Sequence, residues 1–187
     1  MRKRIYLGAV LAAAPLLIAA AATNLSFQPG SRVWVQGTST VRGWRCESTA
    51  VEGSAQAAGT ELSALASVGG ATLTIPVASL DCRNQTMNGH LRKALKADEA
   101  PAIRLRATSV RVAADGSAKL DGELTIAGST QPVSIDATVS SEDGQVRVRG
   151  QEALVMTAYD VRPPSLMMGT MRVNPNVTVG FDVVLKP

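Results

Sequence analysis

The chain has 187 residues and a net charge of +4, and three of these four positive charges come from Arg2, Lys3 and Arg4 at its start. The rest of the chain is close to neutral, which gives no electrostatic reason to expect a nucleic-acid partner. Its length suits one domain, large enough for a packed core or a barrel.

The first 22 residues have the pattern of a secretory signal peptide. The basic start precedes an apolar run over residues 5–18, short for a bilayer span, and then Ala20, Ala21 and Ala22. A retained membrane anchor is the other interpretation, but the length and flanks of the run disfavour it. We expect cleavage after residues 1–22, which leaves residues 23–187 as one periplasmic domain without a stable membrane span.

The first part of this domain has three segments in which apolar and polar residues alternate, as in half-buried strands. They cover residues 32–36, 41–51 and 71–80, and the second is the weakest pattern. Pro76 lacks an N–H, which predicts a sheet edge, a bulge or a lapse in pairing. Residues 53–70 are small and polar, and they fit either a long loop or a short helix.

One helix is predicted within residues 81–100. Met87, Leu91 and Leu95 recur at helical spacing, and basic residues lie elsewhere around the helix. Pro101 ends the pattern.

The second half of the domain returns to the strand pattern. Alternation begins at Ile103 and continues with its parity shifted by one, which predicts a β-bulge near Thr108. The clearest pattern covers residues 118–139, where two alternating runs flank a Gly-containing connection over residues 127–132, as in an antiparallel hairpin.

Two further strands are predicted at residues 146–150 and 177–185. Together these patterns indicate an all-β fold of about eight antiparallel strands with one inserted short helix. A sandwich is possible, but an up-and-down, lipocalin-like barrel hides strand edges better.

The inside of such a barrel would be underfilled. Several inward positions hold small side chains, namely Ala107, Gly122, Ala137 and Gly150. Only Phe181 is a certain inward ring, and because protein interiors pack tightly, the remaining space predicts a ligand cavity. The alternative is that Trp34, Trp44 and the methionines fill it.

Cys46 and Cys82 are the only cysteines. An exported protein meets an oxidising compartment, so we expect a disulfide between neighbouring strands, with Cα atoms roughly 4.4–6.8 Å apart. Two buried free thiols are the alternative. We expect no metal site, because His90 is the only histidine and no ligand cluster surrounds it.

Catalysis is not expected either. The chain has no Gly-x-Ser-x-Gly motif, and His90 has no evident partner to orient it as a general base. We expect His90 to sit on the predicted helix and to make a structural hydrogen bond.

Three segments carry a family resemblance. Residues 124–133 are similar to a strand–Gly–Thr–Lys–Pro–Val hairpin, with Gln131 in place of the lysine. Residues 88–91, Asn-Gly-His-Leu, and the later Pro-Ala-Ile are similar to an Arg-Asp-x-His-Leu segment and its following strand. Residues 163–181 resemble a closing segment. On these motifs, residues 34–185 resemble the YceI-like family of exported, lipocalin-like proteins that bind polyisoprenoid lipids.

The resemblance implies a barrel that holds a polyisoprenoid-type lipid without catalysis or cofactor, with the inserted helix over the mouth. With the strand parities, it predicts an apolar lining of Trp34, Leu73, Ile75, Leu91, Leu95, Ile103, Leu105, Leu124, Ile135, Ala137, Met156, Met167 and Phe181. Methionines 156, 167, 168 and 171 either line the lipid entrance or pack their own loop. The alternative function is a periplasmic interaction or stress-related module without a ligand.

Overall fold

The structure is a computed structural model that describes residues 22–66 and 68–187. Residues 1–21, which hold nearly all of the expected signal peptide, lie outside the described residues. The strands are β1 (Thr23–Phe27), β2 (Arg32–Ser39), β3 (Gly43–Ser48), β4 (Glu52–Ala57), β5 (Val68–Pro76), β6 (Ala102–Val112), β7 (Ser117–Ile126), β8 (Ser129–Glu142), β9 (Gln145–Val155), β10 (Ser165–Leu166) and β11 (Met171–Lys186). The helices are α1 (Gln85–Ala94) and the 3-10 turns η1 (Leu62–Ala66), η2 (Val77–Ser79), η3 (Met156–Tyr159) and η4 (Met167–Gly169).

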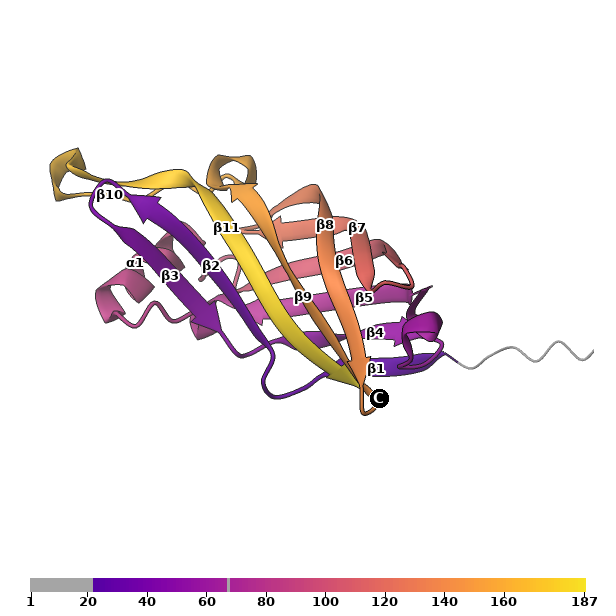
Figure 1. Cartoon of the computed structure of the whole chain (residues 1–187). Coiled ribbons are helices and arrows are strands. Elements are labelled where there is room, and N and C mark those ends of the chain that lie inside the picture. Colours follow the sequence, from indigo (N-terminus) through magenta and orange to yellow (C-terminus); the bar gives the residue numbers. More distant parts are fainter. Residues whose placement is uncertain (1–21, 67) are drawn as a thin grey trace, which may run out of the picture.

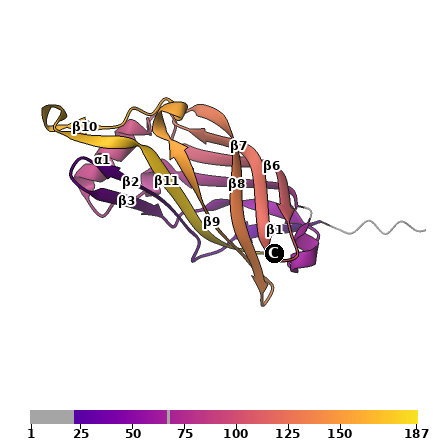
Figure 2. The same ribbon diagram turned by 45° about the horizontal axis from the view of Figure 1, so that its top comes forward.

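Eight of the strands form a closed antiparallel barrel, as predicted (Figure 1). Their order is β1-β4-β5-β6-β7-β8-β9-β11, and β1 returns to β11 through the pairs Ser26–Lys186 and Phe27–Leu185. β2 and β3 extend the sheet beyond β11, and β10 pairs with the start of β11. The turned view in Figure 2 shows α1, the β2–β3 turn and β10 at one end of the barrel, which we call the mouth end.

The β2–β3 hairpin completes the barrel wall at the mouth end. The outer edge of β3 meets the segment after β5 through one bridge, in which Glu47 and Asp81 exchange two backbone hydrogen bonds of 2.9 Å. The Cys46–Cys82 disulfide lies beside this bridge, which confirms the predicted pairing. Cys82 follows the bridge and is not part of a strand, and the Cα atoms are 3.9 Å apart, closer than expected.

The central hairpin is confirmed, but its turn is tighter than predicted. β7 and β8 are joined by Ala127 and Gly128 alone, both with positive φ (51° and 83°). The pattern concealed this, because alanine is rare in a left-handed turn and Pro132 suggested a break. Pro132 instead lies within β8, where β9 does not yet pair, since β8–β9 pairing begins at Ala137.

Three strands, β1, β4 and the two-residue β10, were not predicted, whereas one predicted irregularity is present. β4 carries small and polar residues without a clear two-residue period, and β1 is only five residues long, so the alternation of Leu25 and Phe27 with polar residues was too short to identify a strand. The register of β6 against β7 shifts between Ala107 and Ser109, which confirms the predicted bulge near Thr108.

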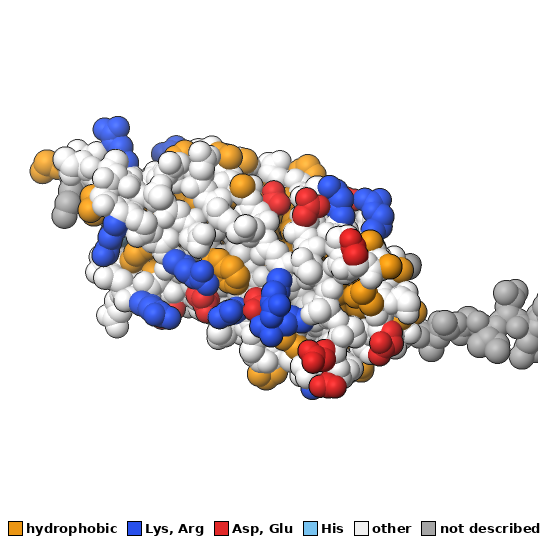
Figure 3. Space-filling model, viewed as in Figure 1, with side chains coloured by type: hydrophobic (Ala, Val, Ile, Leu, Met, Phe, Trp, Pro, Cys, Tyr) orange, Lys and Arg blue, Asp and Glu red, His pale blue; other side chains and the backbone are white. Residues whose placement is uncertain are grey.

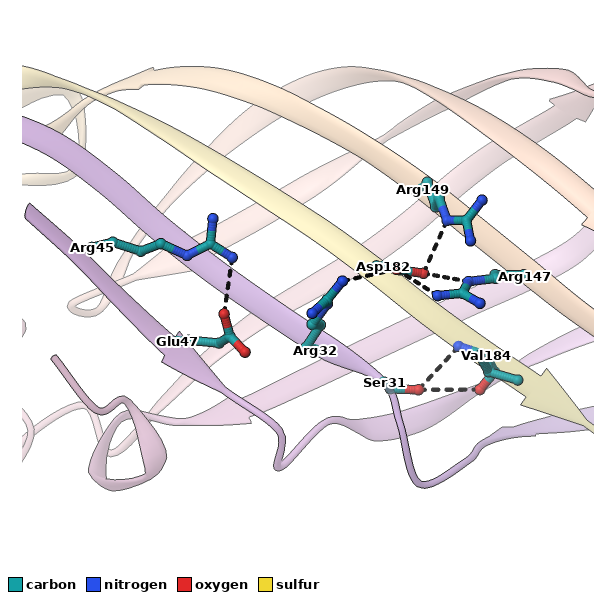
Figure 4. Close-up of polar contacts among 8 residues, drawn as sticks. All are labelled: Ser31, Arg32, Arg45, Glu47, Arg147, Arg149, Asp182 and Val184. Atoms are coloured by element: carbon teal, nitrogen blue, oxygen red, sulfur yellow. Dashed lines mark hydrogen bonds and ion pairs between the residues drawn. The ribbon is translucent and has the colours of Figure 1, made fainter. Parts of the chain in front are cut away.

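An ion-pair cluster covers the outer face where β2, β9 and β11 meet (Figure 4). Asp182 is only 8% exposed and accepts hydrogen bonds of 2.6 and 2.7 Å from Arg147. Arg149 and Arg32 approach the same carboxylate at 3.3 and 3.4 Å. The hydrogen bonds from Arg147, opposed in part by burial, lower the pKa of Asp182 from 3.8 to about 2.

This shift predicts a pH-dependent contribution to stability. Because the pKa is lowered in the folded state, the contribution is present above about pH 4 and is lost as pH falls toward 2. We expect Asp182→Asn to lower the free energy of unfolding by about 2 kcal/mol at neutral pH. Urea midpoints at neutral pH and near pH 2 test this, and a difference between wild type and variant that does not shrink in acid would contradict it.

Candidate ligand-binding cavity

The barrel contains two adjacent apolar cavities. The outer cavity, about 320 Å³, lies at the mouth end beneath α1, and the inner cavity, about 200 Å³, lies deeper in the barrel. Six residues line both cavities: Val33, Ile75, Ile103, Leu124, Leu154 and Val179. The two cavities are therefore adjacent inside the barrel and share one apolar wall.

Helix α1 lines the outer cavity, and its N-terminal half is fixed to the segment that follows β5. Asn84 caps the helix by accepting a hydrogen bond of 3.0 Å from the Met87 backbone N–H. Asn88 accepts one of 2.7 Å from the Cys82 N–H and donates one of 2.9 Å to Asp81. The helix is shorter than the pattern suggested, since the left-handed Lys96 (φ 53°) follows it well before Pro101.

The structure brings most of the predicted lining residues together. The outer cavity is bordered by Ile75, Leu91, Leu95, Ile103, Leu124 and Met156. The inner cavity is bordered by Leu73, Ile75, Ile103, Leu105, Leu124, Ile135, Ala137 and Phe181. The side chain of Met167 lies outside what the structure describes. The helix and the strands thus supply the two parts of one lining.

Trp34 requires a correction. It borders the outer cavity, but its ring lies on the outer face of the sheet, against its partner Gly180, where an added Cβ would come within 2.3 Å of the ring. The guanidinium of Arg45 lies 4.3 Å from the ring centroid on the same side. The period of two assigns Trp34 to the face opposite Val33, so its ring is not part of the proposed lipid path.

Sequence reasoning missed part of the lining because it ended the β9 strand too early. β9 continues to Val155, and the inward parity set by Val146 and Val148 continues through Glu152 and Leu154. Among the described residues, Glu152 is the one charged side chain that lines the inner cavity. Burial, and secondly the charge of Glu152, raises the pKa of Tyr159 above its usual value.

The polar residues of the outer cavity gather near its mouth. Arg42 comes from the β2–β3 turn, and Asn84, Thr86 and His90 come from the start and middle of α1. His90 lies on α1, as predicted, and its structural role stays a prediction, because no hydrogen bond to it is found within residues 22–66 and 68–187. The arrangement offers a long apolar space with polar groups at one end.

Neither a metal centre nor a membrane helix is found in the described part of the chain. Residues 22–66 and 68–187 contain no group of three or more His, Cys, Asp or Glu placed to hold a metal ion. None of their helices combines the length and apolar character needed to cross a bilayer.

Several solved protein structures have a similar fold. BcnA from Burkholderia cenocepacia matches with a TM-score of 0.70 at 20% identity, covering 83% of this chain and 96% of that one. A polyisoprenoid binding domain from Saccharophagus degradans, implicated in plant cell wall breakdown, matches with a TM-score of 0.67 at 13% identity, covering 87% and 97%. A YCEI protein from Campylobacter jejuni matches with a TM-score of 0.59 at 16% identity, covering 72% and 79%.

At these identities the structural likeness concerns the fold alone. No curated protein matches the chain. The model of one family, described as the YceI-like domain, matches residues 18–185, which is nearly the whole sequence. The chain therefore belongs to the YceI-like family.

Proposed function

We propose that the protein is a periplasmic, non-catalytic carrier that holds a long polyisoprenoid-type lipid inside the barrel. The observation that carries the proposal is the pair of adjacent apolar cavities inside the barrel. The polyisoprenoid binding domain from Saccharophagus degradans, which has the same fold, supports this class of ligand.

The physical basis of binding would be apolar burial. A branched hydrocarbon chain gains about 25 cal/mol for each Å² removed from water, and it needs few directed polar contacts. We propose contacts from Leu73, Ile75, Leu91, Leu95, Ile103, Leu105, Leu124, Ile135, Ala137, Met156 and Phe181. The polar end of the lipid would remain at the mouth, near Arg42, Asn84 and His90, where it stays hydrated.

The periplasmic location is part of the same proposal. The signal-like pattern of residues 1–22 and the Cys46–Cys82 disulfide support export into an oxidising compartment. Purification of the exported protein and sequencing of its first residue would test cleavage after Ala22.

Titration of the delipidated protein with a long-chain polyprenol tests the carrier function. Trp44 borders the outer cavity, so its fluorescence can report filling. Leu124→Gln places an amide where the two cavities meet, and we expect it to weaken binding at least about tenfold. Because His90 only borders the mouth, His90→Gln should keep the dissociation constant within about threefold.

Glu123→Gln is the matched control on the outer face of the same strand and should bind like wild type. Circular dichroism confirms that each variant is folded. Saturable binding by wild type that Leu124→Gln does not weaken would argue against the cavity as the site. If wild type shows a catalytic activity that His90→Gln loses while it stays folded, the result would favour an enzyme over a carrier.

A further inference from the structure

Exposed apolar side chains are concentrated at the mouth end. Among the described residues, the large hydrophobic side chains that are strongly exposed are Val41 (65%), Val155 (45%) and Met168 (107%). Val41 lies in the β2–β3 turn, Met168 in η4, and Val155 at the end of β9. Val41 and Met168 therefore lie in loops of the mouth end, whereas Val155 lies in the barrel wall, paired with Asn176 of β11, and none of the three lies at the opposite end of the barrel.

The loops that carry Val41 and Met168 are held together. The Thr40 hydroxyl donates to the Thr170 carbonyl at 3.0 Å and accepts from the Arg172 N–H at 3.2 Å. The Thr40 N–H also donates to the Arg172 carbonyl at 3.0 Å. Ser39 fixes the turn itself by accepting from the Val41 N–H at 3.2 Å. The two apolar tips thus belong to one supported edge, which we call the mouth rim.

Basic side chains flank the mouth rim. Besides Arg92, which donates to the Ala78 carbonyl, the mouth end carries Arg42, Arg83, Lys93, Lys96, Arg162 and Arg172. Its acidic residues are fewer: Asp81, Asp98, Glu99 and Asp160. Asp81 is moreover engaged, since it accepts from the Arg83 N–H at 2.8 Å and from Asn88 at 2.9 Å.

The opposite end carries both signs. Glu61, Asp115, Glu142 and Asp143 lie in or beside its turns, and Arg111, Lys119 and Lys186 lie near the same end. On the face seen in Figure 3, red and blue side chains both occur toward this end, whereas blue side chains extend to the mouth end. The excess of basic residues is therefore a feature of the mouth end.

We propose that the mouth rim docks on the surface of a bilayer that contains anionic lipids. Exposed apolar tips that enter the headgroup region, with basic residues around them, are the combination that binds such surfaces. In this orientation the cavity entrance faces the bilayer, so a lipid chain could pass between them without crossing water. The mouth rim would dock on the bilayer whichever apolar molecule the cavity holds.

Flotation with vesicles tests the proposal on the full exported chain. We expect binding to phosphatidylcholine vesicles that contain phosphatidylglycerol, and much weaker binding to phosphatidylcholine alone. Binding should weaken as salt is raised. Val41→Asp with Met168→Asp should reduce the partition coefficient at least about tenfold, and Arg42→Gln about fivefold.

Ala113→Asp with Ala114→Asp is the matched control, because it adds the same two negative charges at an exposed turn of the opposite end. It should bind vesicles like wild type. Equal losses in the control and the rim variants, or no binding of the folded protein to anionic vesicles, would overturn the proposal. So would a dimer in analytical ultracentrifugation that only the rim substitutions dissociate, because the rim would then be a protein interface. Bound lipid, measured on the same samples, reports separately on the carrier function.

Discussion

Removing the disulfide by Cys46→Ser and Cys82→Ser should lower the free energy of unfolding by about 3.5–4 kcal/mol. The two cysteines are 36 residues apart, so the crosslink restricts a long stretch of the unfolded chain. Urea denaturation of the variant and of wild type, with and without reductant, measures the effect. Reduced wild type should match the variant, and a loss below about 1 kcal/mol would mean that other contacts hold this part of the barrel.

The position of the disulfide predicts where the variant loosens. Without it, the contact between β3 and the segment after β5 rests on the Glu47–Asp81 bridge, with its two backbone hydrogen bonds, and on the hydrogen bond of 2.6 Å between the Ser48 and Ser79 hydroxyls. Amide exchange should therefore accelerate at Glu47 and Asp81, while β7 and β8 remain protected by their long pairing. Uniform acceleration along the chain would indicate that the disulfide acts on global stability alone.

The second large effect concerns the inner cavity. Ala137 pairs with Gly150 in β9, and the Phe181 ring lies against Gly150, so this region contains the small side chains that leave the barrel underfilled. If the cavity holds lipid, Ala137→Phe should fill the space, leave the free energy of unfolding within about 1 kcal/mol of wild type and abolish lipid retention. In a filled core the same ring would overpack the interior and lower the free energy of unfolding by roughly 1–3 kcal/mol or more.

Thr138→Phe is the matched control, because its side chain lies on the outer face of the same strand. It introduces the same ring without entering the barrel, and it should change neither stability nor retained lipid. Loss of lipid in both variants would point to a general effect of a bulky residue on β8.

The sequence predicted the barrel where alternation was strong. The parity of residues 118–139 placed Leu124, Ile135 and Ala137 on the inner face, and the parity shift after Ala107 located the bulge. These predictions succeeded because a half-buried strand has a fixed period of two. Pairing partners and closure did not follow from this pattern, since it does not specify which strands are neighbours.

The failures also have identifiable physical causes. β4 contains small residues on both faces, so its sequence carries no burial signal. The ring of Trp34 lies outside because Gly180 leaves room for it on the outer face, a complementarity between strands that are distant in sequence. The mouth rim is held together by hydrogen bonds of Thr40 to Thr170 and Arg172, and the periodicity of the sequence does not predict these contacts.

The most direct test of the carrier function is native mass spectrometry of the exported wild-type protein, compared with Ala137→Phe. We expect wild type to appear with an added apolar mass that solvent extraction removes and that fragmentation identifies as an isoprenoid-type lipid. Ala137→Phe should appear as the bare chain with the same fold. Bare wild-type protein in every preparation, combined with a strongly destabilised Ala137→Phe, would contradict the carrier function and indicate a filled barrel.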